Sequence, residues 1–248
     1  MKLLTCSNAR WLPRMRPYLS SLADHSPFDN VLLGVGCRVP GLFLEDLLGV
    51  RAIELPATVL EGTPAETESV QHGAWLPYVD GPEDEVVTFT DGDIVMQRRP
   101  SDAEMSFFAS LPDGAVTCGW NSGPSETLEV EAGRLFPRYS REQMINTWGA
   151  RYLTAPCYNI GVVAARRSTW RRIYAEYMAQ WGKACAAFGG PARQQWLVCL
   201  VIDALGLRVD LMPYSVHTHG CYPLPAGAAI VAGELTYQGA PVLFRHHV

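Results

Sequence analysis

The most informative part of this sequence is Val86-Val87-Thr88-Phe89-Thr90-Asp91-Gly92-Asp93-Ile94-Val95-Met96. Its first five residues are β-branched or aromatic, which is typical of a buried strand. The strand leads directly into Asp91-Gly92-Asp93, and in open α/β sheets ligands bind beyond the carboxyl ends of strands. Two carboxylates on either side of a glycine can converge on one cation, and oxygen ligands suit Mg²⁺ or Mn²⁺. A plain turn is the alternative, because Asp-Gly is a common turn pair, but the apolar residues on both sides favour a metal site.

Strand-like and helix-like segments alternate on both sides of this stretch. Strands are expected at 2–6, 30–35, 51–55, 85–89, 115–118, 158–165, 207–212 and 241–244. Helices are expected at 11–22, at 168–187 with Ser168 as its N-cap, and at 191–205 with Pro191 in its first turn. Residues 56–69 and 122–137 show little periodicity and are expected to be surface loops. The alternation predicts an α/β fold, a single Rossmann-like domain over 1–248 with a mostly parallel central sheet flanked by helices.

Composition excludes several classes of protein. The chain has 248 residues, of which 48% are hydrophobic and 18% charged, unlike a disordered chain. The sequence contains no run of about 18 apolar residues, so no membrane span is predicted. The net charge of −5 argues against a general nucleic-acid-binding protein. The N-terminus lacks the apolar run of a secretory signal, and the seven cysteines are scattered without a Cys-x-x-Cys pair, so we expect reduced thiols in a cytoplasmic protein.

The stretch that ends in Asp91-Gly92-Asp93 resembles the DxD motif of metal-dependent glycosyltransferases of the GT-A fold. The likeness is to the group that includes glycogenin and the bacterial lipopolysaccharide galactosyltransferases. Three more segments resemble that group in the expected order: strand 3–5 with Cys6-Ser7-Asn8, Tyr158-Asn159-Ile160-Gly161-Val162-Val163, and Val242-Leu243-Phe244-Arg245-His246-His247. The resemblance implies a GT-A fold and the transfer of a sugar from a nucleotide diphosphate sugar, a UDP-sugar, to an acceptor hydroxyl.

The resemblance also implies a metal-ligand set. Asp93 would bind the ion most directly, and Asp91 would bind the ion, the donor ribose or both. His246 would be the third ligand, with His247 as the alternate. An imidazole among carboxylates favours Mn²⁺ over Mg²⁺. The alternative for both histidines is an exposed, frayed tail.

Further residues would form the donor site. Asn159 and Gly161 would line the sugar pocket, and a glycine in a strand also lets a ligand approach closely; simple packing is the alternative for Gly161. Thr5, Ser7 and Asn8 would contact the nucleotide.

The sequence departs from the family's pattern in three places, the first of which is Asn8, where the family's first loop often carries aspartate. The family often has an Asp-Gln pair at the start of the late helix, whereas here Arg193 or Gln194 stands in place of the aspartate. Gln194 and Gln195 are therefore the candidates for catalytic contact with the donor sugar. The family's Gly and Lys after the metal-binding histidine have no counterpart in this sequence, so a basic contact with the diphosphate would either be missing or come from Arg245, Arg98 or His72.

Two other features stay open at this stage. His217-Thr218-His219 places two histidines on one side of an expected strand, where they would bind zinc, line the sugar or acceptor pocket, or form structural hydrogen bonds. Trp120, at the end of an expected strand, is a candidate for stacking on an acceptor. The acceptor itself, a sugar, a lipid-linked group or a small molecule, is not identified by the sequence.

Two alternative functions remain. A catalytically degenerate glycosyltransferase fold would act as a binding or scaffold protein, and the altered stretch at Gln194 motivates this alternative. A phosphatase of the haloacid dehalogenase type also places Asp-x-Asp after a strand, but it needs Gly-Thr where this chain has Ile94-Val95.

Overall fold

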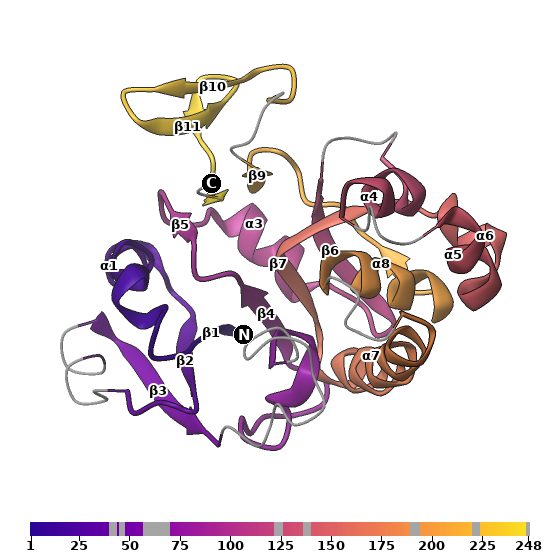
Figure 1. Ribbon diagram of the computed structural model, residues 1–248. Coiled ribbons are helices and arrows are strands. Elements are labelled where there is room, and N and C mark those ends of the chain that lie inside the picture. Colours follow the sequence, from indigo (N-terminus) through magenta and orange to yellow (C-terminus); the bar gives the residue numbers. More distant parts are fainter. Residues whose placement is uncertain are drawn as a thin grey trace.

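The computed structural model describes residues 1–39, 44, 48–56, 70–121, 126–135, 140–188, 194–219 and 224–246 (Figure 1). The strands in these ranges are β1 (Lys2–Ser7), β2 (Asp29–Val35), β3 (Val50–Leu55), β4 (Val86–Thr90), β5 (Ile94–Met96), β6 (Ala115–Trp120), β7 (Tyr158–Arg166), β8 (Arg208–Val209), β9 (His217–His219), β10 (Ala228–Val231), β11 (Glu234–Tyr237), β12 (Ala240–Pro241) and β13 (Phe244–His246). The helices are η1 (Leu12–Met15), α1 (Arg16–His25), η3 (Val70–Ala74), α3 (Asp102–Ala109), α4 (Leu128–Leu135), α5 (Arg141–Trp148), α6 (Ala150–Leu153), α7 (Arg167–Phe188) and α8 (Gln194–Ala204).

A seven-stranded sheet in the order β3-β2-β1-β4-β7-β6-β8 forms the centre of the fold. Neighbouring strands are parallel except at β7, which runs antiparallel to both β4 and β6. This confirms the expected mostly parallel sheet. The strand order changes direction between β1 and β4, because β2 and β3 extend the sheet on one side of β1 and β4 extends it on the other. Such a switch point leaves a crevice at the carboxyl ends of the two strands, where open α/β sheets bind ligands.

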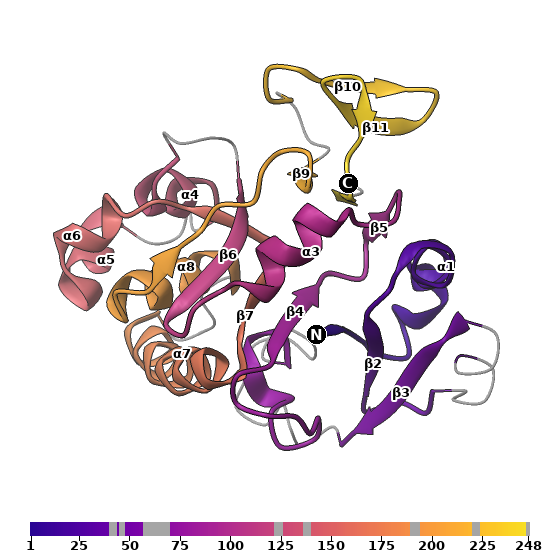
Figure 2. The ribbon, with the colours of Figure 1, turned by 180° about the vertical axis from the view of Figure 1, so that it is seen from behind.

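Both faces of this sheet are buried. Successive residues of a strand point to opposite faces, so Leu4 and Val163 belong to a core with α7 and α8, whereas Leu3 and Val162 belong to a second core with α1 and α3. Figures 1 and 2 show α4 to α8 gathered beside β6 and β7, with α1 beside β2. Burial on both faces explains why the strands read as continuous apolar runs rather than alternating ones.

The C-terminal part adds two small sheets. β13 pairs antiparallel with β5 and parallel with β9, which places it beside the residues that follow Asp93. β10, β11 and β12 form a separate antiparallel sheet that projects from the body near the C-terminus (Figure 1).

Several helices differ from the sequence-based expectation. The expected loop 122–137 contains α4, and α3, α5 and α6 were not predicted. Two of these helices carry a readable signal, because Ser101 with Glu104 and Ser140 with Gln143 form capping boxes.

The starts of the two long helices differ as well. α7 begins at Arg167, directly after β7, so Ser168 is not its N-cap; the Ser168 hydroxyl donates to Asp113 instead. The N-terminal segment expected as a helix divides into η1 and α1. The expected start of the last long helix at Pro191 and most of the expected loop 56–69 lie outside the described residues.

The late strands are shorter than expected. The strand predicted at 207–212 is confined to β8, and the one predicted at 241–244 is divided between β12 and β13. None of the six cysteines in the described ranges forms a disulfide, as expected of reduced thiols. Among the described helices, we find none with the length and apolar character needed to cross a membrane.

Candidate metal centre

Asp91 and Asp93 lie in a tight turn at the carboxyl end of β4. The backbone N–H of Asp91 donates to the carbonyl of Gly161 on β7 at 2.8 Å, and the N–H of Ile94 donates back to the Asp91 carbonyl at 3.2 Å. Gly92 packs against Met15, where an added Cβ would lie 3.1 Å from Cε of that side chain. The turn is therefore fixed by β7 on one side and by Met15 on the other, while the Asp93 side chain stays 54% exposed.

His246 reaches the same place from the other end of the chain. It is the last residue of β13, and the β13–β5 ladder pairs it with Ile94, the residue after Asp93. Its Nε2 lies 3.4 Å from Oδ1 of Asp93. Asp91, Asp93 and His246 each offer a ligand atom within 4.8 Å of the others, and this is the one such group among the residues that the structure describes. The structure therefore brings together the three side chains for which the sequence resemblance implied a metal-binding role.

Gly161 makes room for this imidazole. A Cβ at Gly161 would lie 2.8 Å from Cε1 and Nδ1 of His246 and 3.0 Å from Oδ1 of Asn159. Asn159 is buried, and its Oδ1 accepts the Gly161 N–H at 2.9 Å. The two predicted sugar-pocket residues thus adjoin the metal centre, and Gly161 has a clear local role in seating His246.

The charge at this cluster suits a divalent cation. Burial lowers the pKa of His246, but the hydrogen bond to Asp93 and the charges of Asp93 and Asp91 outweigh it, so the pKa lies above its ordinary value. The same negative potential that holds a proton on the imidazole would attract a metal ion in place of that proton. Two carboxylates and one imidazole are ligands that Mn²⁺ accepts, so the residues fit the implied ion.

His217 lies next to this group without belonging to it. The β6–β7 ladder shifts register between Cys118 and Gly119, and the His217 ring occupies the space that a side chain at Gly119 would need. The ring is buried and its centroid lies 6.2 Å from that of His246. β9 supplies His217, as the sequence predicted, whereas the side chain of His219 lies outside the described part of the chain.

The predicted nucleotide contacts line the end of β1. Thr5 and Ser7 are buried, and the Ser7 hydroxyl donates to the Asn8 carbonyl at 3.2 Å. Oδ1 of Asn8 accepts the backbone N–H groups of Arg10 and Trp11 at 3.1 and 3.0 Å, which closes the turn that leads into η1. Since β1 and β4 are neighbours, this turn and the Asp91 turn lie on either side of the switch point.

Gln195 takes part in a polar cluster that the sequence did not reveal. Its Nε2 donates to Oε1 of Glu131 at 3.5 Å, and Asn121 donates to Glu131 at 3.5 Å and to Glu126 at 3.0 Å. Both glutamates are buried. They were missed because residues 122–137 were expected to be a loop. Gln194 begins α8, but its side chain lies outside the described part.

The three candidate basic residues have other surroundings. His72 is buried against the ring of Tyr177, with ring centroids 4.8 Å apart, and desolvation lowers its pKa to about 3. In these surroundings the imidazole carries no positive charge, and a contact of His72 with the diphosphate stays a prediction. Arg98 binds Glu104, and Nη1 of Arg245 donates to the carbonyl of Gly233. Each of these side chains thus has a packing or structural contact.

Trp120, the candidate acceptor platform, lies half-buried at the end of β6. Its ring centroid is 6.1 Å from that of Tyr158, the first residue of β7. The two aromatic rings therefore adjoin the strand that carries Asn159 and Gly161.

Comparison with known proteins agrees with the fold. No protein-family model and no curated protein matches this sequence. Solved structures do match. The galactosyltransferase LgtC, solved with donor and acceptor sugar analogues, matches with a TM-score of 0.62 at 13% identity over 100% of this chain and 87% of that one. Mouse xyloside xylosyltransferase 1 in its apo form matches with a TM-score of 0.55 at 12% identity over 100% and 98%. The bifunctional glycosyltransferase WbbM matches with a TM-score of 0.57 at 12% identity over 88% and 40%. The chain therefore has the GT-A-like fold of these glycosyltransferases, as the sequence resemblance implied.

Proposed function

We propose that this chain transfers a sugar from a nucleotide diphosphate sugar to an acceptor hydroxyl, with a divalent cation held by Asp91, Asp93 and His246. The observation that carries the proposal is the convergence of these three side chains at the switch point of a glycosyltransferase fold. We further propose UDP-sugar as the donor and Mn²⁺, or Mg²⁺, as the cation. The acceptor is a sugar, a lipid-linked group or a small molecule.

Each part of the chain has a task in this reaction. A bound cation would neutralise the charge that develops on the departing diphosphate. Asp91, Asp93 and His246 hold and orient it. The turn at Asn8 and the end of β1 receive the nucleotide, and Asn159 with Gly161 lies beneath the donor sugar. Gln195, held by Glu131, contacts the sugar near the reacting carbon, while Trp120 provides a surface on which an acceptor sugar stacks.

The deciding experiment is thermal unfolding of the protein with UDP, GDP, CDP and dTDP, each with and without MnCl₂. Binding to the native state raises the melting temperature by mass action. We expect a rise with UDP that needs Mn²⁺ and that Asp93→Ala abolishes. Asp84→Ala is the matched control, because Asp84 is an exposed aspartate on the turn before β4, at the opposite end of that strand.

The scaffold alternative predicts a different result. A degenerate fold without donor binding shows no metal-dependent shift with any of the four nucleotides. A shift with a nucleotide other than UDP would retain the transferase proposal and change its donor. We also propose, for the whole chain, one domain and a cytoplasmic location; fractionation of cells that express a tagged chain tests the location.

A further inference from the structure

The metal centre joins two parts of the chain that are far apart in sequence. Asp91 and Asp93 precede β5, whereas His246 ends a C-terminal arm, which we define as residues 224–246. The ladder between β5 and β13 has three residue pairs. Such a short ladder leaves the position of His246 dependent on other contacts between the arm and the body.

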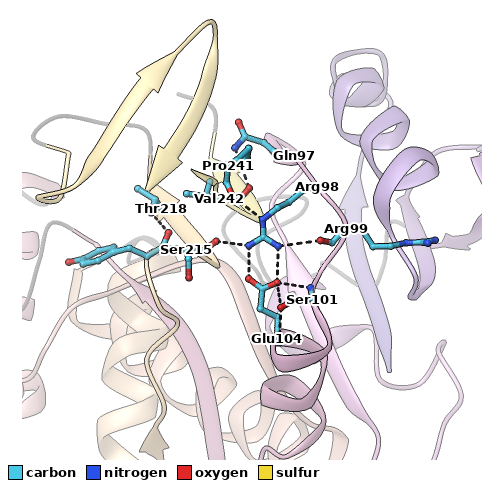
Figure 3. A network of polar contacts seen from close by, with 10 residues as sticks. Gln97, Arg98, Arg99, Ser101, Glu104, Ser215, Thr218, Pro241 and Val242 are labelled. Carbon is cyan, nitrogen blue, oxygen red and sulfur yellow. Dashed lines mark hydrogen bonds and ion pairs between the residues drawn. The ribbon is translucent and has the colours of Figure 1, made fainter. Parts of the chain in front are cut away.

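Besides the ladder that β13 forms with β9, several of those contacts come from the two residues that follow β5. The Gln97 side chain donates to the carbonyls of Leu235 and Val242 at 2.7 and 3.2 Å, and its Oε1 accepts the Leu235 N–H at 2.9 Å. Arg98 Nε donates to the carbonyl of Pro241 at 2.8 Å, and Nη2 donates to that of Ser215 at 3.2 Å (Figure 3). Both side chains therefore bind the main chain of segments that lead into β13 and β9.

Arg98 is itself held in a fixed orientation. Its two terminal nitrogens bind the two carboxylate oxygens of Glu104 at 2.8 and 2.6 Å. One of those oxygens also accepts the backbone N–H of Ser101 at 2.8 Å, within the capping box of α3 (Figure 3). A bidentate pair of this kind fixes the plane of the guanidinium as well as its charge. The start of α3 is thus the rigid support for the arm.

One carbonyl links the two strands that carry the imidazoles. The carbonyl of Ser215 accepts both Arg98 and the backbone N–H of Leu243, and the next residue, Phe244, donates to Val216 at 2.8 Å. Arg98 therefore holds the main chain just before β9 and just before β13 through the same side chain. Two residues past Phe244, the same strand presents His246 to Asp93.

We propose that Arg98, oriented by Glu104, is a positioning residue that holds the C-terminal arm so that His246 completes the metal centre. This inference rests on the proposed function for the identity of the centre. Removal of groups that hydrogen-bond metal ligands commonly changes metal affinity 10- to 100-fold, and Arg98, which acts through the main chain, should have an effect at the lower end of that range. The direction of the change in Mn²⁺ affinity separates positioning from plain electrostatics. Loss of the positive charge of Arg98 alone would leave Mn²⁺ binding unchanged or make it tighter, whereas loss of positioning weakens it.

The test compares full-length Arg98→Met and Arg98→Lys with a matched control, Lys2→Met. Lys2 also forms a largely buried ion pair, with Glu85 at 2.7 Å, but at the amino end of β1. Mn²⁺ binding is measured by electron paramagnetic resonance of the free ion. We expect binding about tenfold or more weaker in Arg98→Met and nearly as weak in Arg98→Lys, because an ammonium keeps the charge but cannot reproduce the fork. Lys2→Met should stay within about twofold of the wild type.

A second readout needs no metal. Hydrogen exchange of the metal-free protein should show faster exchange at the amides of Leu243 and Phe244 in Arg98→Met, with no change in β1 and β2. Equal exchange in wild type and Arg98→Met, or Mn²⁺ binding lowered no more than in Lys2→Met, overturns the positioning role. If the wild type binds no Mn²⁺, the proposed Mn²⁺ centre fails, and the exchange result still decides whether Arg98 positions the arm.

Discussion

The imidazole Nε2 of His246 lies 3.4 Å from Oδ1 of Asp93, and the ring rests on Gly161 of the central sheet. The three residues come from three separate segments: the turn after β4, strand β7 and strand β13. A metal centre built this way depends on backbone contacts at each segment as much as on the ligands themselves.

Gly161→Ala should weaken Mn²⁺ binding about tenfold or more without unfolding the protein. The added Cβ would lie 2.8 Å from two atoms of the His246 ring, so the ring must leave its present position beside Asp93. Isothermal titration with MnCl₂ measures the effect. Gly182→Ala in α7 is the control: nothing lies within 4 Å of its Cβ, and alanine should stabilise that helix by about 0.5–1 kcal/mol. Unchanged Mn²⁺ binding in Gly161→Ala would contradict the seating role of this glycine.

Glu104→Gln should destabilise the protein in a pH-dependent way. Burial raises the pKa of Glu104, but the hydrogen bonds from Arg98 and Ser101 outweigh it, so the net pKa is below the ordinary value of 4.5. A depressed carboxyl pKa contributes stability that is fully present above the ordinary pKa and is lost as pH falls through the folded value. Urea unfolding of wild type and variant at pH 7 and near pH 4 should therefore show a difference in the free energy of unfolding that shrinks in acid. A difference that is constant with pH would argue against the ionic contact.

Gln195→Ala should leave UDP binding nearly unchanged and lower the rate at which UDP-hexoses are hydrolysed. The side chain contacts Glu131 and Cys157 rather than the metal ligands, so the Mn²⁺-dependent melting shift with UDP should be nearly unchanged. Slow hydrolysis of UDP-hexoses, followed by release of UDP, should fall about tenfold or more if the glutamine contacts the reacting sugar. An equal rate in the variant and the wild type would remove Gln195 from the catalytic site.

Tyr18→Phe should reduce stability and leave the metal centre intact. The Tyr18 hydroxyl shares a buried hydrogen bond of 2.5 Å with Thr90 Oγ1, the last residue of β4. Loss of such a bond typically costs about 1 kcal/mol, and more where the remaining partner is left unsatisfied. Urea unfolding measures the change, with Ser110→Ala, which removes an exposed hydroxyl, as the control. A large loss of Mn²⁺ affinity in Tyr18→Phe would mean that α1 fixes the Asp91 turn more directly than we infer.

Short stretches of sequence predicted those strands whose apolar residues are contiguous. The apolar runs at β1, β2, β4 and β7 predicted buried strands, because a strand covered on both faces needs apolar residues throughout. The metal-binding role of Asp91 and Asp93 was predicted on equally local grounds, because a turn directly after such a strand places both carboxylates at the edge of the sheet where ligands bind. The capping boxes at Ser101 and Ser140 were equally local, and α3 and α5 could have been predicted from them.

Resemblance supplied what local patterns could not. His246 was chosen over His247 because it follows the expected strand, and the ladder to β5 now places it beside Asp93. No property of residues 242–247 alone indicates the partner of that strand. The helix α4, which carries the buried Glu131, and the buried Glu126 just before that helix were not predicted, because tertiary packing overrides weak local propensity.

Contiguous residues are enough to predict that this chain forms an α/β sheet with a carboxylate pair at the end of a central strand, because each of these features depends on neighbours in the sequence. The surroundings of side chains that meet across the chain come from the packing of distant elements. That packing places His72 against Tyr177, where desolvation keeps the imidazole neutral, and Arg98 between Glu104 and the carbonyls of the C-terminal arm. Charge, burial and hydrogen-bond partners depend on which elements pack together, so no local pattern predicts them.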